Sequence, residues 1–453
     1  MSTDSVTHVG TVGGVDINTL VSSLMQSEQA PLIQLQNEIV TEQDKLGRWT
    51  DVEARLSTLQ GKTTQLTTAS VWEQMSATVT QTTSVLSASA ESTASEASYD
   101  IDVSFLAKSH RIGSDAQASA SDALTLTGDF TVGGQLITVV SGDSVRTIAD
   151  KINAAASSMT DANKVRASVV DTTLVLDRVQ TGTTAISLSD GTNGVLKTLG
   201  VLDAGDAVNH VLQEGHNLEM TVNGVSVNRA TNTGLTDVIS DVTLSFSATG
   251  TSNLAVARDT ASIKTLLQDF ISAYNSAMTK IKSEGVATVS TTNSVTAGPL
   301  VGDSLLRAIG GRSRELVTGT AATDPDISAD FDTLRKIGIT TSGVDNSLTI
   351  DSAILDEALL NHFDAVEALI RDPEAGVMKQ FDTYLSGLLK PTEGTLDQRQ
   401  SAINENISRR NDTVARMERN LTVYQNSLYE QFSYVQNVIS ELDQQRSYLS
   451  GIL

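Results

Sequence analysis

The C-terminal end of the chain carries apolar residues at a constant spacing of seven. The row consists of Ile407, Val414, Leu421, Leu428, Val435, Leu442 and Leu449. A second row, offset by three residues, is interrupted by Arg410, Gln431 and Gln445. Rows with this period indicate a helix that packs against another helix. Because neither Pro nor Gly occurs between Leu396 and Ser450, the pattern predicts one helix of about 55 residues, roughly 80 Å long.

The N-terminal part of the chain offers a partner for this helix. Its apolar face is formed by Leu32, Ile39, Leu46, Trp49, Val52, Leu56, Leu59 and Leu66. Pro31 suits the first turn of a helix, and residues 17–25 predict a short separate helix with Asp16 as its N-cap. An ordinary helical bundle explains these stripes as well. Their position at both chain ends favours a leg built from the two termini.

Between the helical ends the apolar period changes to two. Alternating stretches rich in Val, Thr and Ser run from Thr78 to Arg258 and predict β-strands. Asn223 and Gly224 lie between two short alternating runs, which is a strong signal for a β-hairpin. "TVGGQLITV" resembles "TVNGVSVNR", and each is followed by a short amphipathic segment. Two related β subdomains are therefore expected.

Helical patterns resume after Thr260, with a small β element in "GITTSGVDNSLTID". The expected fold class is a multidomain α+β protein. Long terminal α-helices form a coiled-coil or helical-bundle leg, and a β-rich head of two subdomains is inserted between them. The expected parts are an N-terminal helical segment (1–40), a leg domain (41–77 with 260–395), a β subdomain (78–115 with 212–259), a distal β subdomain (116–211) and a C-terminal coiled-coil helix (396–453).

Composition narrows the functional classes. A chain of 453 residues is longer than one core usually supports. The 54 acidic residues against 31 basic ones give a net charge of −23, which disfavours nucleic acid and anionic membranes as partners. No apolar run approaches the roughly 20 residues of a membrane span, and the start lacks the regions of a secretory signal peptide. The absence of cysteine excludes disulfides and thiolate metal sites.

Residues with catalytic chemistry are sparse. Of the five histidines only His210 and His216 are close in sequence, without a third ligand at metal spacing. The glycine pairs lack a Walker lysine and a dinucleotide fingerprint, and no G-x-S-x-G elbow occurs. We therefore expect no catalytic, cofactor-binding or metal-binding residues, and an enzyme is the least favoured class.

Three blocks of sequence resemble one protein family. They are "GGVDINTLVSSLMQSEQAPLIQLQ" near the start, "TVNGVSVNRATNTGLTDVISDVTLSF" with "VARDTASIKTLLQDFISAYN" in the middle, and "NLTVYQNSLYEQFSYVQNVISELDQQRSYL" near the end. In this order, and with the helix, β, helix layout, they resemble the bacterial flagellar filament cap family, also called flagellar hook-associated protein 2. The resemblance spans nearly the whole chain and is weakest over residues 116–211.

The resemblance implies a ring-shaped homo-oligomer, a pentamer, at the extracellular tip of the flagellar filament. The β heads would form a plate, and the helical legs would reach the growing end. There they would retain exported flagellin and promote its folding and polymerisation. The resemblance also implies an export chaperone before secretion, export through the flagellar type III route without a cleaved signal peptide, and no nucleic acid, membrane or cofactor.

The resemblance further implies which terminal positions contact neighbouring subunits and the filament. They are Leu20, Leu24, Leu32, Leu35 and Ile39, together with Leu421, Leu428, Phe432, Val435, Leu442 and Leu449. We expect these side chains to remain unpaired until a partner covers them.

Two alternatives share the same layout. Another axial protein, flagellin or a hook-filament junction protein, also has coiled-coil ends, but the "LSSG" and "AADDAAGL" type runs expected of flagellin do not occur. A surface adhesin would use the β head to bind a host glycan or protein and the coil as a stalk. Loss of the terminal helices would stop filament growth for a cap, whereas an adhesin mutant would swim but fail to attach.

Overall fold

The computed structural model describes residues 11–12, 15–81, 83–289, 295–321, 327–342 and 347–450. The chain forms two compact units. The leg unit consists of residues 1–68 and 260–453, and the β unit consists of residues 69–259. The expected α+β class is confirmed, because long terminal helices enclose an inserted β-rich segment. Residues 69–77 were expected in the leg but belong to the β unit, where strand β3 already begins at Met75.

The leg unit is mainly helical. Its helices are α1 (Ile17–Thr67), α5 (Thr260–Gly285), α6 (Ser304–Thr318), α7 (Ser352–Asn361), α8 (Phe363–Arg371), α9 (Val377–Leu389) and α10 (Thr395–Ser450). Its short strands pair as β1 (Thr11–Val12) with β2 (Val15–Asp16), β18 (Ala287–Val289) with β19 (Val295–Ala297), and β20 (Ile339–Thr341) with β21 (Leu348–Ile350). Two 3-10 turns, η3 (Ala329–Phe331) and η4 (Leu334–Ile337), complete it. The single 56-residue helix α10 confirms the C-terminal prediction.

Helix α1 organises the core of the leg unit, since it packs against α5, α9 and α10. Trp49 and Leu56 on α1 are fully buried, as the apolar spacing predicted. Three aromatic side chains fill the space between α5 and α9. The Phe381 ring centroid lies 5.9 Å from that of Phe270 and 6.2 Å from that of Tyr274. Burial raises the pKa of Tyr274 to about 12, so its hydroxyl is neutral at physiological pH.

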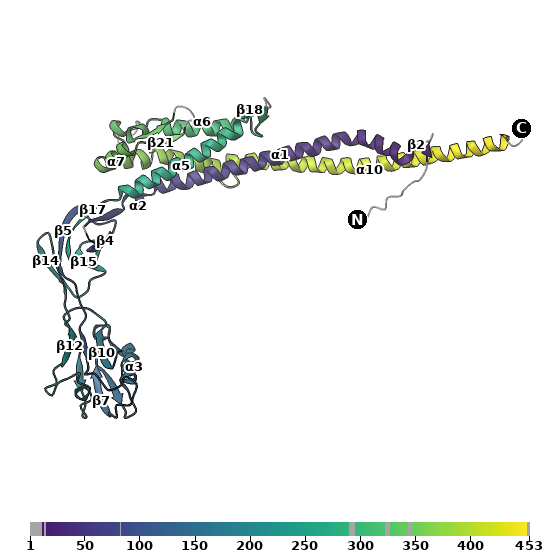
Figure 1. Ribbon diagram of the computed structural model, residues 1–453. Helices are drawn as coiled ribbons and strands as arrows, with labels where there is room; N and C mark the ends of the chain where they lie inside the picture. Colours follow the sequence, from purple (N-terminus) through teal and green to yellow (C-terminus); the bar gives the residue numbers. More distant parts are fainter. Residues whose placement is uncertain are drawn as a thin grey trace. The chain divides into compact units, whose positions relative to one another are not determined.

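The N-terminal helix differs from the prediction of two separate helices. Helix α1 is continuous from Ile17 through Pro31 to Thr67. An interior proline removes one backbone hydrogen bond and costs about 3 kcal/mol. The helix continues because Met25 before the proline and Ile39 after it are both buried, and α1 is bowed in this region (Figure 1). Asp16 does occupy the N-cap position, but its side chain does not cap the backbone.

Among the described residues, the β unit contains four sheets and three α-helices. A five-stranded sheet has the order β14 (Val225–Arg229), β13 (Leu218–Val222), β5 (Ala97–Phe105), β17 (Gly250–Arg258) and β3 (Met75–Thr80). A three-stranded sheet has the order β15 (Leu235–Ile239), β16 (Val242–Phe246) and β4 (Leu86–Ala90). A four-stranded sheet has the order β12 (His210–Gln213), β6 (Arg111–Gly113), β10 (Thr173–Arg178) and β9 (Val165–Val170). Another three-stranded sheet has the order β11 (Leu188–Asp190), β7 (Gly128–Val132) and β8 (Gln135–Val139).

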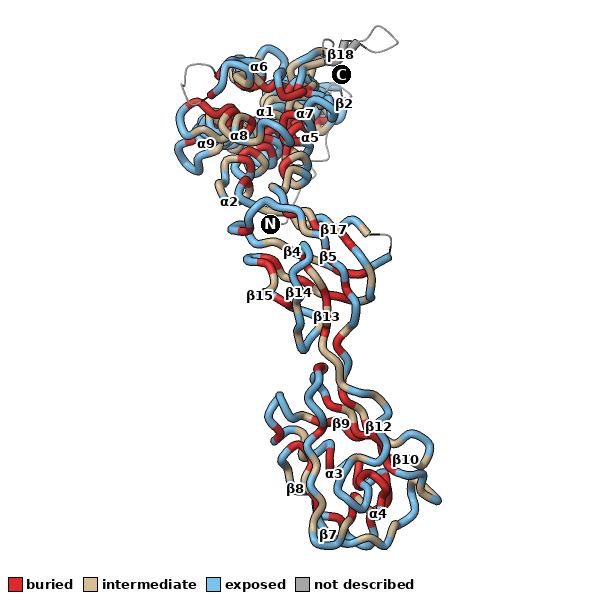
Figure 2. Tube along the Cα trace, turned by 90° about the vertical axis from the view of Figure 1, so that its left-hand side faces the viewer, coloured by how far each residue is buried: buried red, intermediate tan, exposed pale blue. Residues whose placement is uncertain are grey.

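The β unit has two hydrophobic cores, which Figure 2 shows as separate groups of buried residues. One lies between the five-stranded sheet and the sheet that contains β4, and includes Leu218 and Leu244. The other includes Phe130 and Leu174 and is covered by helix α3 (Val145–Ala155) and helix α4 (Val195–Thr198). Helix α2 (Ala69–Trp72) and the 3-10 turns η1 (Ala156–Ser158) and η2 (Asp161–Asn163) complete the β unit.

The two β-hairpins that resemble each other in sequence also match in geometry. Val132 pairs with Gln135 and Val222 pairs with Val225, so each hairpin has a two-residue turn. Both turns have two residues with positive φ, Gly133 with Gly134 and Asn223 with Gly224, as this hairpin turn requires. The segments that follow differ, because the first continues into helix α3 and the second into strand β15. The repeat thus covers the hairpins alone.

Candidate assembly interface

Helix α10 is anchored at its N-terminal end by polar contacts to the leg core. Arg399 binds Asp303 at 2.6 Å, and the same aspartate caps helix α6 through the backbone N–H of Leu305. The Nε2 atom of Gln400 donates to the Oε2 atom of Glu53 on α1 at 2.6 Å. These contacts fix the direction in which α10 leaves the core.

Helices α1 and α10 then run antiparallel and side by side (Figure 1). Residues further along α10 meet residues earlier in α1, since Arg410 pairs with Glu38. Near the start of α1, a small hydrophobic cluster joins the two helices. It contains Ile17, Val21, Met25 and Leu428, with Leu421, Tyr429 and Phe432 packed against it. The heptad row of α10 therefore faces α1 up to about one turn beyond Leu428.

Beyond this cluster the same heptad row is exposed. Val435 is 40% exposed, Leu442 57% and Leu449 62%. Every residue from 440 to 450 is exposed, because α1 begins at Ile17 and does not extend alongside the end of α10. We call residues 434–450 the α10 tip. Its apolar row is exposed in the described chain.

The structure divides the eleven residues of the predicted interface into three groups. Ile39 and Leu428 are buried within the chain. Leu20, Leu32, Leu35, Leu421 and Phe432 are half-buried. Leu24, Val435, Leu442 and Leu449 are exposed. The last three share the α10 tip and form one row on it, whereas Leu24 stands apart from them on α1. Whether these residues contact neighbouring subunits stays a prediction.

The interface predicted from the heptad rows did not include two tyrosines on the α10 tip. Tyr434 is 70% exposed and Tyr448 73%, and each precedes a residue of the heptad row by one position. The signal was present in the sequence, because the two are 14 residues apart, which is two heptads. The tip is therefore apolar on more of its circumference than the heptad row alone indicates.

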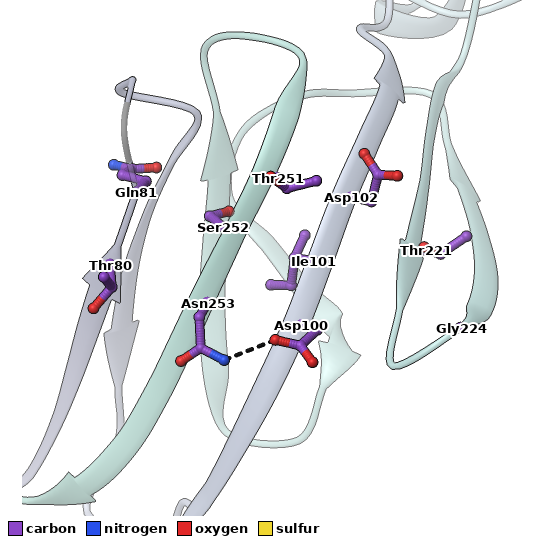
Figure 3. A pocket seen from close by; sticks show the side chains of 10 residues that line it. All are labelled: Thr80, Gln81, Asp100, Ile101, Asp102, Thr221, Gly224, Thr251, Ser252 and Asn253. Carbon is purple, nitrogen blue, oxygen red and sulfur yellow. Dashed lines mark hydrogen bonds between the residues drawn. The ribbon is translucent and has the colours of Figure 1, made fainter.

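The β unit offers a polar pocket on its five-stranded sheet. Figure 3 shows its lining side chains, and its volume is about 630 Å³. The Nδ2 atom of Asn253 donates to the Oδ1 atom of Asp100 at 2.8 Å. Asp102 and Thr221 belong to the same lining, which contains no basic or aromatic side chain. Such a surface provides neither a counter-charge for an anion nor a platform on which a sugar ring could stack.

Two of the histidines are engaged individually. His210 Nε2 lies 2.6 Å from Asp115 Oδ1, and His216 Nδ1 lies 2.6 Å from the carbonyl oxygen of Asn217. Among the described residues, no group of three or more His, Cys, Asp or Glu side chains could hold a metal ion. In the same part of the chain, no helix is both long and apolar enough to cross a membrane.

Comparisons with known proteins identify the family. Residues 13–110 match the family model of the flagellar hook-associated protein 2 N-terminus, and residues 215–444 match that of its C-terminus. The chain is 25% identical to flagellar hook-associated protein 2 of Escherichia coli K12, over 98% of this chain and 97% of that protein. It is 26% identical to A-type flagellar hook-associated protein 2 of Pseudomonas aeruginosa, over 97% and 96%.

A solved structure is similar as well. The crystal structure of the D1-D2-D3 domains of the flagellar cap protein FliD from Escherichia coli has a TM-score of 0.53 and 25% sequence identity. The match covers 79% of this chain and 99% of that structure. Together these matches define a flagellar axial protein of the cap class. The chain belongs to the flagellar hook-associated protein 2 family.

Proposed function

We propose that this chain caps the tip of a bacterial flagellar filament, outside the cell, as a ring of five identical subunits. The β units form the plate of the cap, and the terminal helices reach the growing end of the filament. There they retain exported flagellin and promote its folding and polymerisation. Before export through the flagellar type III route, a chaperone covers the exposed apolar row. The proposal rests on the family membership together with the exposed row of the α10 tip.

The change in burial along one heptad row carries this proposal. Leu428 is 6% exposed against α1, while Leu442 and Leu449, two and three heptads further on, are exposed. Burying apolar surface contributes about 25 cal/mol per Å², so a helix that contacts this row would be stabilised by each side chain that it covers. An exposed apolar row that continues one packed against a neighbouring helix is typical of a binding surface for another helix.

The proposal is tested by a double substitution that leaves the leg core intact. Leu442→Ala with Leu449→Ala removes most of the exposed row without touching the buried cluster at Leu428. In cells that lack their own cap protein, we expect this variant to be made and exported but not to restore filament growth. Electron microscopy of filament length and swimming in soft agar give the measurement.

The matched control changes two polar residues on the same part of the helix. Asp443→Ala with Ser447→Ala lies on the tip and is exposed, so it tests any general effect of altering this segment. The control should restore long filaments and swimming as the unaltered chain does. Full-length filaments with the Leu442 and Leu449 variant would show that the exposed row does not carry the function. Failure of the unaltered chain would count against the cap function itself.

A further inference from the structure

The α10 tip has a regular order of residues around its apolar row. With Val435, Leu442 and Leu449 at heptad position a, the d positions are Val438 and Gln445. The flanking g positions are then Tyr434, Glu441 and Tyr448, and the e positions are Ile439 and Arg446. Residues at e and g border the contact in a coiled coil and determine partner and orientation. The residues at e and g of the tip therefore carry information about the partner and its orientation, in addition to the apolar row at a.

Glu441 and Arg446 are the charged residues on these flanks, and both are exposed. Neither makes an ion pair with another residue in the ranges that the structure describes. They are five positions apart along one helix. In a parallel coiled coil, a g residue faces the e residue five positions further along the neighbouring helix. Glu441 of one copy would therefore face Arg446 of the next.

Two of the remaining flank residues agree with the same arrangement. Tyr434 at g would face the half-buried Ile439 at e, an apolar pair one heptad before the charged pair. A shift by one heptad would instead place Glu441 opposite Ile439 and leave the charges unmatched. In an antiparallel pair, g faces g and e faces e, so Glu441 would lose its basic partner. Among pairings of two identical tips, the complementary charges and the apolar pair thus arise together only when the helices are parallel and in register.

We propose that the α10 tip packs against the same segment of a second copy of this chain, parallel and in register, with Glu441 of one copy paired to Arg446 of the next. This inference rests on the self-association in the proposed function and states which surface of the chain mediates it. The contact continues the α1 and α10 interface, because the row that α1 covers as far as Leu428 is covered further on by a neighbouring copy. The self-complementary charges favour a second copy over flagellin as the occupant.

Site-specific crosslinking tests the orientation directly, since the chain contains no cysteine. Val435→Cys and Leu449→Cys are made separately in the full-length purified protein, which is treated with a short bismaleimide. Parallel, in-register tips place each of these positions beside its counterpart, so both variants should form covalent oligomers. Asp443→Cys, at the outward b position, is the control and should remain monomeric on a denaturing gel. Crosslinking at only one of the two positions, or at neither, would overturn the proposal.

Charge reversal tests the pair. Glu441→Arg alone and Arg446→Glu alone should each weaken self-association roughly three- to tenfold, since one exposed ion pair becomes a like-charge contact. The double variant should restore association to within about twofold of the unaltered chain. Asp443→Lys is the control and should change nothing. If the double variant associates no better than the single ones, the Glu441 and Arg446 contact is absent.

These measurements test two claims separately: that the α10 tip binds a second copy of the chain, and that the chain caps the filament. Crosslinking and the self-association of the charge variants, followed by analytical sedimentation, use purified protein without flagellin. Filament growth is measured in cells. If the Leu442 and Leu449 variant stops filament growth but neither cysteine variant crosslinks, the cap function stands and the tip binds flagellin instead. The tips could instead crosslink as expected while filaments still grow with the double alanine variant. Self-association of the tip would then be supported, and a role of the row in filament assembly would be refuted.

Discussion

The two halves of helix α10 have the same heptad row and opposite surroundings. In the half that ends at Leu428 the row lies against α1. Leu428 is buried there, and Ile407, Val414 and Leu421 are half-buried. On the α10 tip the row continues with residues of the same type, yet each of them is exposed. The spacing therefore indicates that this face of the helix packs against another helix. It does not indicate whether that other helix belongs to the same chain.

The difference has energetic consequences. Apolar side chains in the first half stabilise the folded leg, because they leave water when the chain folds. Those on the tip leave water only when a partner binds, so they contribute to association and hardly to the folding of a single chain. Substitutions at equivalent heptad positions should consequently separate into two classes. The predictions that follow test this separation, beginning with the leg core as the reference for full burial.

Phe381→Ala is expected to give the largest effect on stability. The ring is fully buried between Phe270 and Tyr274 in the leg core. Truncation of a buried Phe costs about 3 to 5 kcal/mol through lost burial and the cavity that remains. Urea denaturation monitored by helical circular dichroism should show the loss in the leg unit. A change below about 1 kcal/mol would mean that the aromatic cluster is not the main core of the leg.

Leu428→Ala should give an intermediate effect that is confined to one end of the helix pair. The side chain joins the cluster of Ile17, Val21 and Met25, so its removal should cost about 2 kcal/mol, the lower limit for a buried leucine. Hydrogen exchange should become faster in the first turns of α1 and change little around Trp49. Equal acceleration along all of α1 would contradict a local cluster and indicate one cooperative helix pair.

Much of this architecture could be predicted from the sequence, because it depends on period alone. The heptad rows predicted α10, and the alternation around Asn223 and Gly224 predicted the hairpin of β13 and β14. The continuity of α1 through Pro31 could not be predicted, since it depends on burial at both Met25 and Ile39. Local preference placed a helix start at the proline, and tertiary packing overrode it.

The position of the candidate interface could be predicted from the sequence. Which of its residues are buried within the chain and which are exposed could not. Eleven residues were placed on it by resemblance, and neither resemblance nor period distinguishes Leu428 from Leu442. The distinction arises from the length of α1, which begins at Ile17 and does not extend alongside Leu442 and Leu449. Where two elements of unequal length pair, the overhang can be located only after their register is known.

Leu442→Ala should give the smallest effect on the stability of the single chain and is the sharpest test of the comparison. Its side chain is more than half exposed, so truncation removes little burial, and alanine favours the helix slightly more than leucine does. The free energy of unfolding, measured at a concentration where the protein is monomeric, should change by less than about 0.5 kcal/mol. At higher concentration the same variant should self-associate less than the unaltered chain, because its cost appears only when two tips meet. A stability loss as large as that of Leu428→Ala in the monomer would show that the tip is covered within its own chain, and the contrast between the two halves of α10 would then be wrong.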